Sequence, residues 1–314
     1  MVNTALQLGS LTFKNRVLVA SGTFGYGDET AGLVDLSKIG GLITKSLSLK
    51  PREGNAPRRI AETASGMLNS IGLANIGVHR FISEKLPFLR GVDTAVIANI
   101  AASSVEEYCS VLSLLEREEG VDAFEINVSC PNVREGGLTF GTSCPAVAEI
   151  TRRLRALTSK PLIIKLTPNV THISEFARAA ENEGADALSV INTLIGMAVD
   201  IHSRRPLLST VTGGLSGPAI KPIALAKVYE VVKAVRIPVI GIGGIQTATD
   251  ALEFLITGAS LVQVGTQNFV EPDASVKIAA GIRDWCAARN IGDVHEIVGT
   301  LKAEASASIV ESWL

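Results

Sequence analysis

A cysteine lies among amides and glycines where an apolar run of the chain ends. The stretch INVSCPNVREGGLTFGT, residues 126–142, places Cys130 before Pro131, with Asn127 and Asn132 on either side. No histidine accompanies the thiol, so the sequence does not support a protease-like Cys/His pair. A cysteine can still accept a proton when its surroundings suit that task. The glycines that follow predict a loop that moves as a lid.

Two lysines stand at the ends of apolar runs. Lys165 lies inside PLIIKLTP, and Lys45 lies inside LITKS. Because a buried ammonium is costly without an anionic partner, Lys165 either faces a charged group or reaches water at the strand tip. Two lysines facing one pocket would indicate a ligand that is anionic or becomes so.

Three glycine-containing stretches in the last third of the chain suit a phosphate. They are TGGLSGP (212–218), GIGGI (241–245) and VGT (264–266). Glycines allow backbone N–H groups to approach a phosphate, and barrels often bind one at the loops after strands seven and eight. Ordinary turn formation is the alternative explanation for each stretch.

Short apolar runs recur along the chain with helix-like segments between them, which predicts a parallel sheet covered on both faces. The runs span residues 17–20, 41–45, 94–100, 123–128, 161–166, 187–192, 238–243 and 260–265. Eight such units predict one (β/α)8 TIM barrel domain over residues 1–314. The first 16 residues predict a β-hairpin that caps the barrel bottom. An open doubly wound sheet is the rival, but SGTFGYG does not have the G-x-G-x-x-G spacing.

In such barrels the chemistry lies at the carboxyl ends of the strands. The residues there are polar or glycine on all eight runs: Ser21, Lys45-Ser46, Asn99, Asn127, Lys165, Asn192-Thr193, Gly243-Gly244 and Gly265-Thr266. Eight such positions together predict a site.

Composition and charge exclude several classes of protein. Positive and negative side chains nearly cancel, with 29 Lys and Arg against 31 Asp and Glu, so a nucleic-acid partner is not expected. The four cysteines show no C-x-x-C spacing, so no metal site is expected. Cys109 and Cys286 fit core positions.

His172 is expected to open a helix, and His202 and His295 fit the surface. With no signal peptide or membrane span expected, we predict a cytoplasmic protein.

Several long motifs resemble class 1 dihydroorotate dehydrogenases over almost the whole chain. They are NVSCPN, GMLNSIGL (66–73), SGTFGYG (21–27), NTLIGMAVDI (192–201), TGGLSGPAIKP (212–222) and IGIGGI. The resemblance implies a flavin barrel that oxidises (S)-dihydroorotate to orotate in pyrimidine biosynthesis. The loop after Cys130 is similar to the 1B branch. That similarity implies NAD as acceptor, a partner subunit that is an iron–sulfur flavoprotein with FAD and 2Fe-2S, and a homodimer core of a heterotetramer.

The resemblance also implies roles for individual residues. Cys130 would remove the C5 proton while a hydride passes from C6 to flavin N5, and Lys165 would stabilise the reduced, anionic ring. The FMN site would be completed by Ser21, Lys45, Ser46, Asn99, Asn127, Ile191, Gly217, Gly243, Gly244, Gly265 and Thr266. Substrate would meet Lys45, Asn69, Ser70, Ile71, Gly72, Leu73, Asn127, Asn132, Asn192 and Thr193.

Two other enzymes and one non-enzyme remain as alternatives. The related flavin barrel of dihydropyrimidine dehydrogenases handles uracil-type substrates. A class I aldolase would use Lys165 to form a Schiff base. A binding barrel without catalysis is the third, and the two lysines together with Cys130 speak against it.

Overall fold

Eight parallel strands close into a barrel in a computed structural model that describes residues 1–129, 134–135 and 138–302. Around the barrel the order is β3-β4-β7-β8-β11-β12-β17-β18. The strands are β3 (Val17–Val19), β4 (Gly41–Ile43), β7 (Ala95–Ile100), β8 (Ala123–Asn127), β11 (Leu162–Leu166), β12 (Ala187–Val190), β17 (Val239–Ile242) and β18 (Leu261–Val264). Each coincides with one of the eight apolar runs, so the predicted TIM barrel is confirmed.

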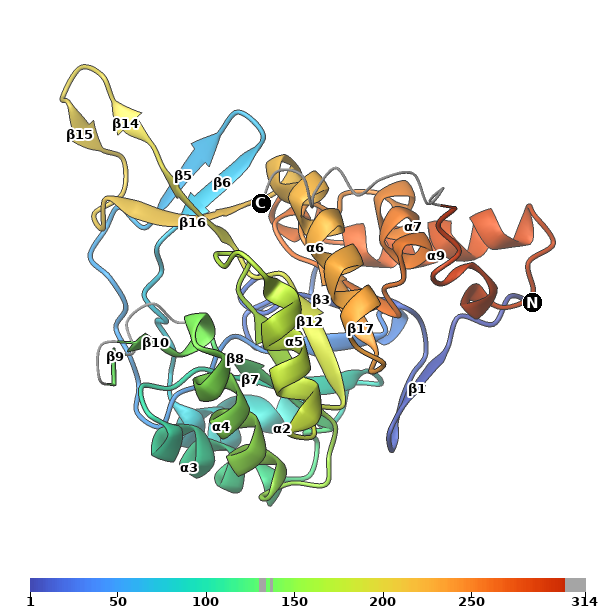
Figure 1. Cartoon of the computed structure of the whole chain (residues 1–314), viewed down its shortest axis with the longest axis horizontal. Coiled ribbons are helices and arrows are strands. Elements are labelled where there is room, and N and C mark those ends of the chain that lie inside the picture. Colours follow the sequence, from blue (N-terminus) through green and yellow to red (C-terminus); the bar gives the residue numbers. More distant parts are fainter. Residues whose placement is uncertain (130–133, 136–137, 303–314) are drawn as a thin grey trace.

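Helices cover the outside of the barrel (Figure 1). They are α1 (Val78–Arg80), α2 (Leu86–Leu89), α3 (Val105–Glu116), α4 (Cys144–Arg155), α5 (Ile173–Asn182), α6 (Lys221–Ala234), α7 (Ala248–Thr257), α8 (Gln267–Val270) and α9 (Ala274–Ala287). Other helical turns are η1 (Asp28–Thr30), η2 (Leu36–Lys38), η3 (Phe81–Lys85), η4 (Phe140–Thr142), η5 (Pro218–Ile220) and η6 (Val294–Ile297). His172 caps the start of α5, as predicted. Between β3 and β4 the chain crosses with η1 and η2 alone.

The amino-terminal hairpin closes the bottom of the barrel. Strands β1 (Leu6–Leu8) and β2 (Leu11–Phe13) pair antiparallel. Phe13 is fully buried and packs with Leu8 against the apolar side chains inside the barrel, such as Leu18 and Ile163. The hairpin therefore acts as the predicted cap, because its apolar face fills the end of the barrel.

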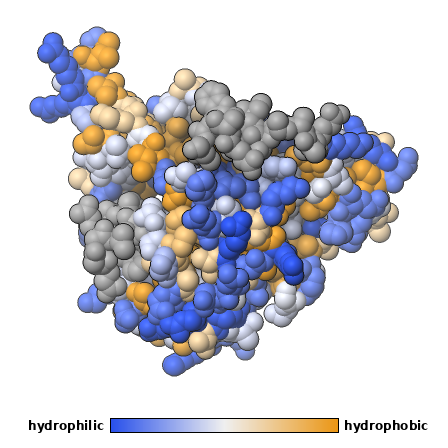
Figure 2. Space-filling view, in the orientation of Figure 1, coloured by the Kyte–Doolittle hydropathy of each residue, from blue (hydrophilic) through white to orange (hydrophobic). Residues whose placement is uncertain are grey.

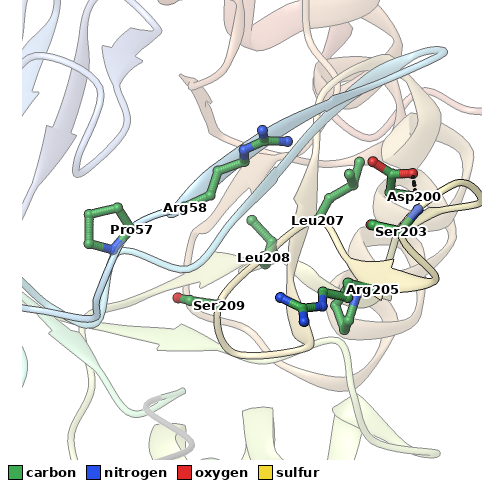
Figure 3. Close-up of a pocket in the computed structure, with 9 residues that line it drawn as sticks. Pro57, Arg58, Asp200, Ser203, Arg205, Leu207, Leu208 and Ser209 are labelled. Carbon is green, nitrogen blue, oxygen red and sulfur yellow. Dashed lines mark hydrogen bonds between the residues drawn. The ribbon is translucent and has the colours of Figure 1, made fainter.

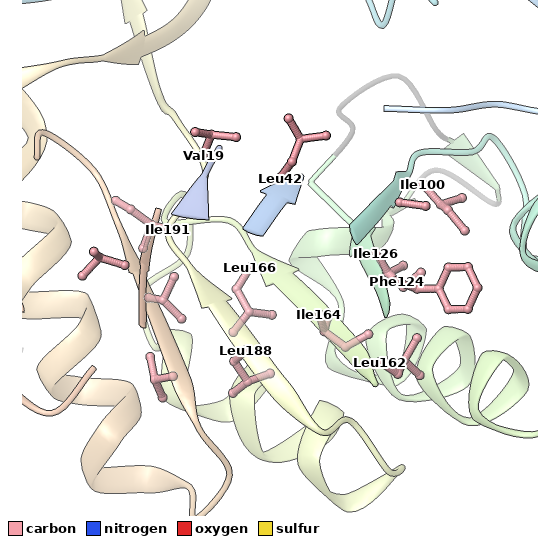
Figure 4. Close-up of a cluster of buried hydrophobic side chains, with 14 of the residues drawn as sticks. Val19, Leu42, Ile100, Phe124, Ile126, Leu162, Ile164, Leu166, Leu188 and Ile191 are labelled. Atoms are coloured by element: carbon pink, nitrogen blue, oxygen red, sulfur yellow. The ribbon is translucent and has the colours of Figure 1, made fainter. Parts of the chain in front are cut away.

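A second apolar layer joins the barrel to its helices. The side chains that point outward from the strands are apolar and buried, as Phe124, Ile164 and Leu188 are (Figure 4). Cys286 lies in this layer with no exposed surface, whereas Cys109 is half-buried at its edge. Burial on both faces explains why the strands show nearly continuous apolar runs.

An additional antiparallel sheet, which the sequence did not predict, is built from chain that follows barrel strands β4 and β12. It pairs in the order β13-β16-β6-β5. Its strands are β5 (Ile60–Thr63), β6 (Gly66–Asn69), β13 (Leu194–Met197) and β16 (Thr212–Ser216). Two further pairs are β9 (Arg134–Glu135) with β10 (Leu138–Thr139), and β14 (Val199–Asp200) with β15 (Arg205–Pro206). These segments are short, and β6, β13 and β16 contain glycine, so their sequences look like loops.

The hairpin β14–β15 projects from one corner of the molecule and carries apolar side chains on its surface (Figures 1 and 2). Ile195, Met197, Val199 and Ile201 alternate along the chain and are all exposed, with Ile195 at 70% and Ile201 at 78%. His202 at the hairpin turn is exposed, as is His295, in agreement with the prediction. Within the described ranges, no helix combines the length and apolar character needed to cross a membrane.

Candidate active site

Inside the barrel, the apolar side chains give way to polar ones toward the carboxyl ends of the strands. Residues two apart on a strand face the same side. Six residues lie two positions beyond an apolar residue of the barrel interior, and we call them the polar tier: Lys45, Asn99, Glu125, Lys165, Ser189 and Gln263. The other two strands place Ala20 and Ile242 at this level. The polar tier forms the floor of the barrel mouth.

Lys165 is buried in this floor and is paired with an acidic residue. Its side chain is only 8% exposed, and its Nζ lies 3.6 Å from Oε1 of the fully buried Glu125. Lys165 is within β11 rather than beyond its end. It therefore does not reach water at the strand tip, and its anionic partner is part of the chain.

Asn99, Ser46 and Lys45 lie beside this pair. Asn99 is fully buried in β7; its Nδ2 donates to Glu125 Oε1 at 2.7 Å, and its Oδ1 accepts from Ser46 Oγ at 2.5 Å. Lys45 is half-buried, and its ammonium makes no ion pair with the described part of the chain. Lys45 is thus the cation of the mouth that could receive an anionic group. Ser21 lies half-buried after β3.

Two asparagine amides meet at the ends of β8 and β12. Asn192 Nδ2 donates to Asn127 Oδ1 at 3.2 Å, and the same oxygen accepts from Ser129 N–H at 3.1 Å. Asn127 Nδ2 donates to no group in the described part of the chain. Both residues are half-buried, so the pair offers amide donors and acceptors without charge. Such groups can bind a planar ring that carries amide N–H and C=O groups.

The three glycine-containing loops come together on the other side of the mouth. Thr266 Oγ1 and Ser216 Oγ share a hydrogen bond of 2.8 Å. Gly244 has φ +71, and a β-carbon there would lie 3.0 Å from the Gly217 carbonyl oxygen and 2.7 Å from Lys221 Cβ. The close approach of these loops therefore requires glycine at position 244.

The backbone of these loops fits a phosphate. The N–H groups of Gly244, Gly265 and Thr266 donate no hydrogen bond within the described chain, and all three residues are half-buried. Lys221 is next to them, but its ammonium is held by Asp250 and Glu253, at 2.6 and 2.8 Å. Those hydrogen bonds raise the pKa of Lys221. The loops therefore offer backbone donors rather than a free lysine.

The predicted substrate loop, residues 69–73, runs from β6 along the edge of the additional sheet. Asn69 Nδ2 donates to the Gly214 carbonyl at 3.2 Å, and Ser70 Oγ accepts from Asn55 Nδ2 at 2.9 Å. A β-carbon on Gly214 would collide with Thr193, which places Thr193 against β16. The additional sheet therefore connects residues from both parts of the predicted substrate site.

Two of the predicted site residues, Cys130 and Asn132, lie outside the described residues. The described chain resumes fully at Leu138, and Gly141 packs close to Val128 and Thr167. The ends of this loop are therefore next to β8 and β11. Cys144, at the start of α4, is half-buried, and burial raises the pKa of its thiol.

One surface pocket lies away from the barrel mouth. It measures about 310 Å³ and lies beside the hairpin β14–β15, where Arg58, Asp200 and Arg205 line it (Figure 3). Asp200 accepts from Ser203 N–H at 3.1 Å, which is a bond within the turn of the hairpin. The pocket contains none of the predicted site residues, so it is distinct from the barrel mouth.

Comparison with known proteins identifies the family. The family model described as dihydroorotate dehydrogenase matches residues 4–285. A protein of Geotalea daltonii is 55% identical over 298 residues, 95% of this chain and 98% of that protein, and one of Thermoanaerobacter sp. is 50% identical over 303 residues, 96% and 100%. Both are named dihydroorotate dehydrogenase B (NAD(+)), catalytic subunit. The chain belongs to the dihydroorotate dehydrogenase family.

A solved structure shares the fold of this chain. It is the crystal structure of DHODH from Eimeria tenella in complex with ferulenol, with a TM-score of 0.78 and 21% identity. The match covers 95% of this chain and 88% of the other. At that identity the comparison supports the barrel fold alone.

Most of the residues at the barrel mouth were predicted from the sequence, but three fully buried ones were not. Glu125, Ser189 and Gln263 are fully buried and bonded to one another. Their positions in the sequence could have identified them. Each is a polar residue on the inward side of an otherwise apolar strand, two residues before a predicted site residue. Asn169 was missed as well; its Nδ2 donates to the Thr193 carbonyl at 3.0 Å.

Proposed function

We propose that this chain is the catalytic subunit of an NAD-linked dihydroorotate dehydrogenase and that its barrel mouth binds FMN beside (S)-dihydroorotate. The observation that carries the proposal is the meeting of Lys165, the Asn127–Asn192 amide pair and the three glycine-containing loops at one mouth, in a member of this family. When bound, FMN supplies the acceptor for the hydride. The reaction would produce orotate in pyrimidine biosynthesis.

The described residues fit such a cofactor. Backbone N–H groups of Gly244, Gly265 and Thr266 would hold the phosphate, with Gly217 and Gly243 allowing the close approach. The ring would be surrounded by Ser21, Lys45, Ser46, Asn99, Asn127, Lys165 and Ile191. In a site that excludes water, the ammonium of Lys165 would stabilise negative charge that develops there.

On the substrate side of the mouth, neutral amides would form hydrogen bonds with a pyrimidine ring. Asn127 and Asn192 offer donors and acceptors that match the amide edge of dihydroorotate. The half-buried ammonium of Lys45 would bind its carboxylate, and residues Asn69, Ser70, Ile71, Gly72, Leu73, Asn132 and Thr193 would complete the pocket. Cys130 would take the proton from C5 as the hydride leaves C6, so that the two hydrogens depart as a proton and a hydride.

The proposal includes a partner that carries the electrons onward to NAD. The relatives at 50–55% identity are named catalytic subunits of an NAD(+) enzyme, which supports a second polypeptide. We propose that this partner is an iron–sulfur flavoprotein with FAD and 2Fe-2S, bound to a homodimer of this chain in a heterotetramer.

The purified protein should contain FMN, and dihydroorotate should bleach the flavin absorbance in the absence of oxygen. Dihydrouracil is the matched control substrate, because it lacks the carboxylate that Lys45 would bind. Bleaching by dihydrouracil but not by dihydroorotate would transfer the chain to the dihydropyrimidine dehydrogenase reaction. A folded, colourless protein that FMN cannot reconstitute would refute the flavin site and reopen the aldolase alternative.

A further inference from the structure

Glu125 has its carboxylate near the axis of the barrel. It lies on β8, has no exposed surface, and is two residues beyond Ala123, whose side chain is inside the barrel. Its Oε2 accepts from Gln263 Nε2 at 2.6 Å. Gln263 lies on β18, four strands away from β8 in either direction around the barrel. The two side chains therefore meet across the interior.

Three strands supply hydrogen-bond donors to this one carboxylate, and a fourth supplies the Lys165 ammonium. Oε1 receives Asn99 Nδ2 at 2.7 Å and has Lys165 Nζ at 3.6 Å. Oε2 receives Ser189 Oγ at 2.7 Å together with the amide of Gln263. Both oxygens are thus bonded, as a buried negative charge requires.

This arrangement gives up stability that an apolar tier would provide. Barrel tiers are commonly filled with branched aliphatic side chains, and a buried ion pair can often be replaced by such residues without loss. Gln263 Nε2 is shared between Glu125 and Ser189, and Gln263 Oε1 is buried with no partner in the described part of the chain. An unpaired buried acceptor is a further cost. Such costs at one place in a fold point to a functional constraint.

Glu125 holds two residues of the proposed flavin site. A lysine has a long, flexible side chain, and the carboxylate below it restricts where the Lys165 ammonium can lie. Asn99 is fixed from both ends, because its Nδ2 donates to Glu125 and its Oδ1 accepts from Ser46. Two groups on the floor of the mouth are therefore held by a residue with no exposed surface of its own.

We infer that Glu125 is a positioning residue that acts on the flavin reaction through Lys165. The inference rests on the proposed function, because it assumes that Lys165 faces the flavin. Because Glu125 has no exposed surface, it would touch neither cofactor nor substrate. It fixes the place of the ammonium and balances its charge, so that the cation stays in the floor of the mouth without a counter-ion from solvent.

A double-mutant cycle with Glu125→Gln and Lys165→Met tests this role. In the FMN-loaded protein, Glu125→Gln should slow anaerobic flavin reduction by dihydroorotate roughly 10- to 100-fold, the scale expected when a reacting group is misplaced. In the Lys165→Met background the same change should alter the rate by no more than about twofold, because the residue through which it acts is gone. Ile163→Val is the matched core control and should leave the rate of flavin reduction unchanged. Ile163 lies on β11 two residues before Lys165, and its side chain is inside the barrel.

Thermal unfolding of the apoprotein provides a second readout. Glu125→Gln should lower Tm by about 5 °C or more, since it leaves a buried ammonium unpaired, and the double variant should recover most of that loss. If Glu125→Gln does not fold, Glu125→Asp keeps the charge, withdraws it by one methylene, and should slow reduction only when Lys165 is present.

These experiments distinguish a failure of the positioning role of Glu125 from a failure of the proposed function. A yellow protein in which Glu125→Gln slows flavin reduction by the same factor with and without Lys165 would overturn the positioning role and leave the proposed function intact. If the protein cannot bind FMN, the proposed function is overturned, whatever the Tm values of the Glu125 and Lys165 variants show.

Discussion

The turn after β8 is held from two sides, and this fixes the direction in which the chain leaves the strand. Asn127 Oδ1 accepts from Ser129 N–H at 3.1 Å, and the Asn127 carbonyl accepts from Tyr108 Oη at 2.7 Å. Tyr108 is fully buried on α3, so the anchor is part of the core. Ser129, the last described residue before the loop, is therefore held in place at the mouth.

Replacing Cys130 tests its proposed role as the base. Cys130→Ala should retain FMN but slow flavin reduction by dihydroorotate at least ~100-fold, the typical effect of losing a general base. Cys130→Ser should also be slow, because a hydroxyl is a much weaker base near neutral pH. Anaerobic stopped-flow absorbance measures the rate. Cys144→Ala is the matched cysteine control and should be unaffected; rapid reduction in Cys130→Ala would mean that another group accepts the proton.

The glycine-containing loops are connected to the helices that follow them. Helix α7 begins with a capping box in which Thr247 Oγ1 accepts from Asp250 N–H at 3.3 Å and Asp250 Oδ2 accepts from Thr247 N–H at 2.8 Å. The other oxygen of Asp250 binds Lys221 at the start of α6, at 2.6 Å. One carboxylate thus ties the starts of α6 and α7 together, and Lys221, to which it binds, lies against Gly244.

Asp250→Asn should show how much the hydrogen bonds of this carboxylate contribute to the free energy of unfolding, and how that contribution depends on pH. Burial alone would raise the pKa of Asp250, but hydrogen bonds from Lys221, Gln246 and Thr247 outweigh it and hold the pKa below its ordinary value. A lowered pKa means that the contribution is complete above the unfolded pKa of about 3.9 and is lost as pH falls through the folded value.

We expect Asp250→Asn to lower the free energy of unfolding by about 1–2 kcal/mol at pH 7. The difference from the unmodified chain should shrink below about pH 4. Denaturant unfolding at pH 7, 5 and 3 measures it. Asp284→Asn, at an exposed position, should change stability by less than about 0.5 kcal/mol. A difference that is constant down to pH 3 would contradict the ionic part of the tie.

At the scale of the molecule, one barrel mouth has to serve every step of the reaction. The additional sheet stands beside this mouth, and strand β13 continues from Asn192 and Thr193 into the projecting hairpin (Figure 1). The sequence has no G-x-G-x-x-G between a first strand and helix, and no cysteines with cluster spacing. With FMN and a pyrimidine in the mouth, little room would remain for a nicotinamide.

The isolated chain should therefore reduce NAD poorly with dihydroorotate as donor, and the iron–sulfur flavoprotein partner should restore that activity. Steady-state turnover of the chain, alone and with the partner, measures this, with fumarate as the alternative acceptor. Rapid NAD reduction by the chain alone would refute the two-subunit arrangement. Rapid fumarate reduction would place the protein in the 1A branch.

The sequence by itself determined the barrel, its hairpin cap and most of its mouth. These follow from local patterns: apolar runs of strand length, helices between them, and polar residues at the strand ends, which a closed parallel barrel must bring together. Lys165 and Asn127 could be found in this way because their distance from a strand end is written in the chain.

Only the tertiary structure decided which groups lie beneath that mouth and beside it. Glu125 and Gln263 are 138 residues apart and meet because eight strands close around one axis; no local pattern pairs them. The additional sheet likewise joins β6 to β16 across more than 140 residues of sequence, through strands too short and too rich in glycine to show a period of their own. Local periodicity reports which face of an element is buried, whereas the partner that buries it depends on how the whole chain closes.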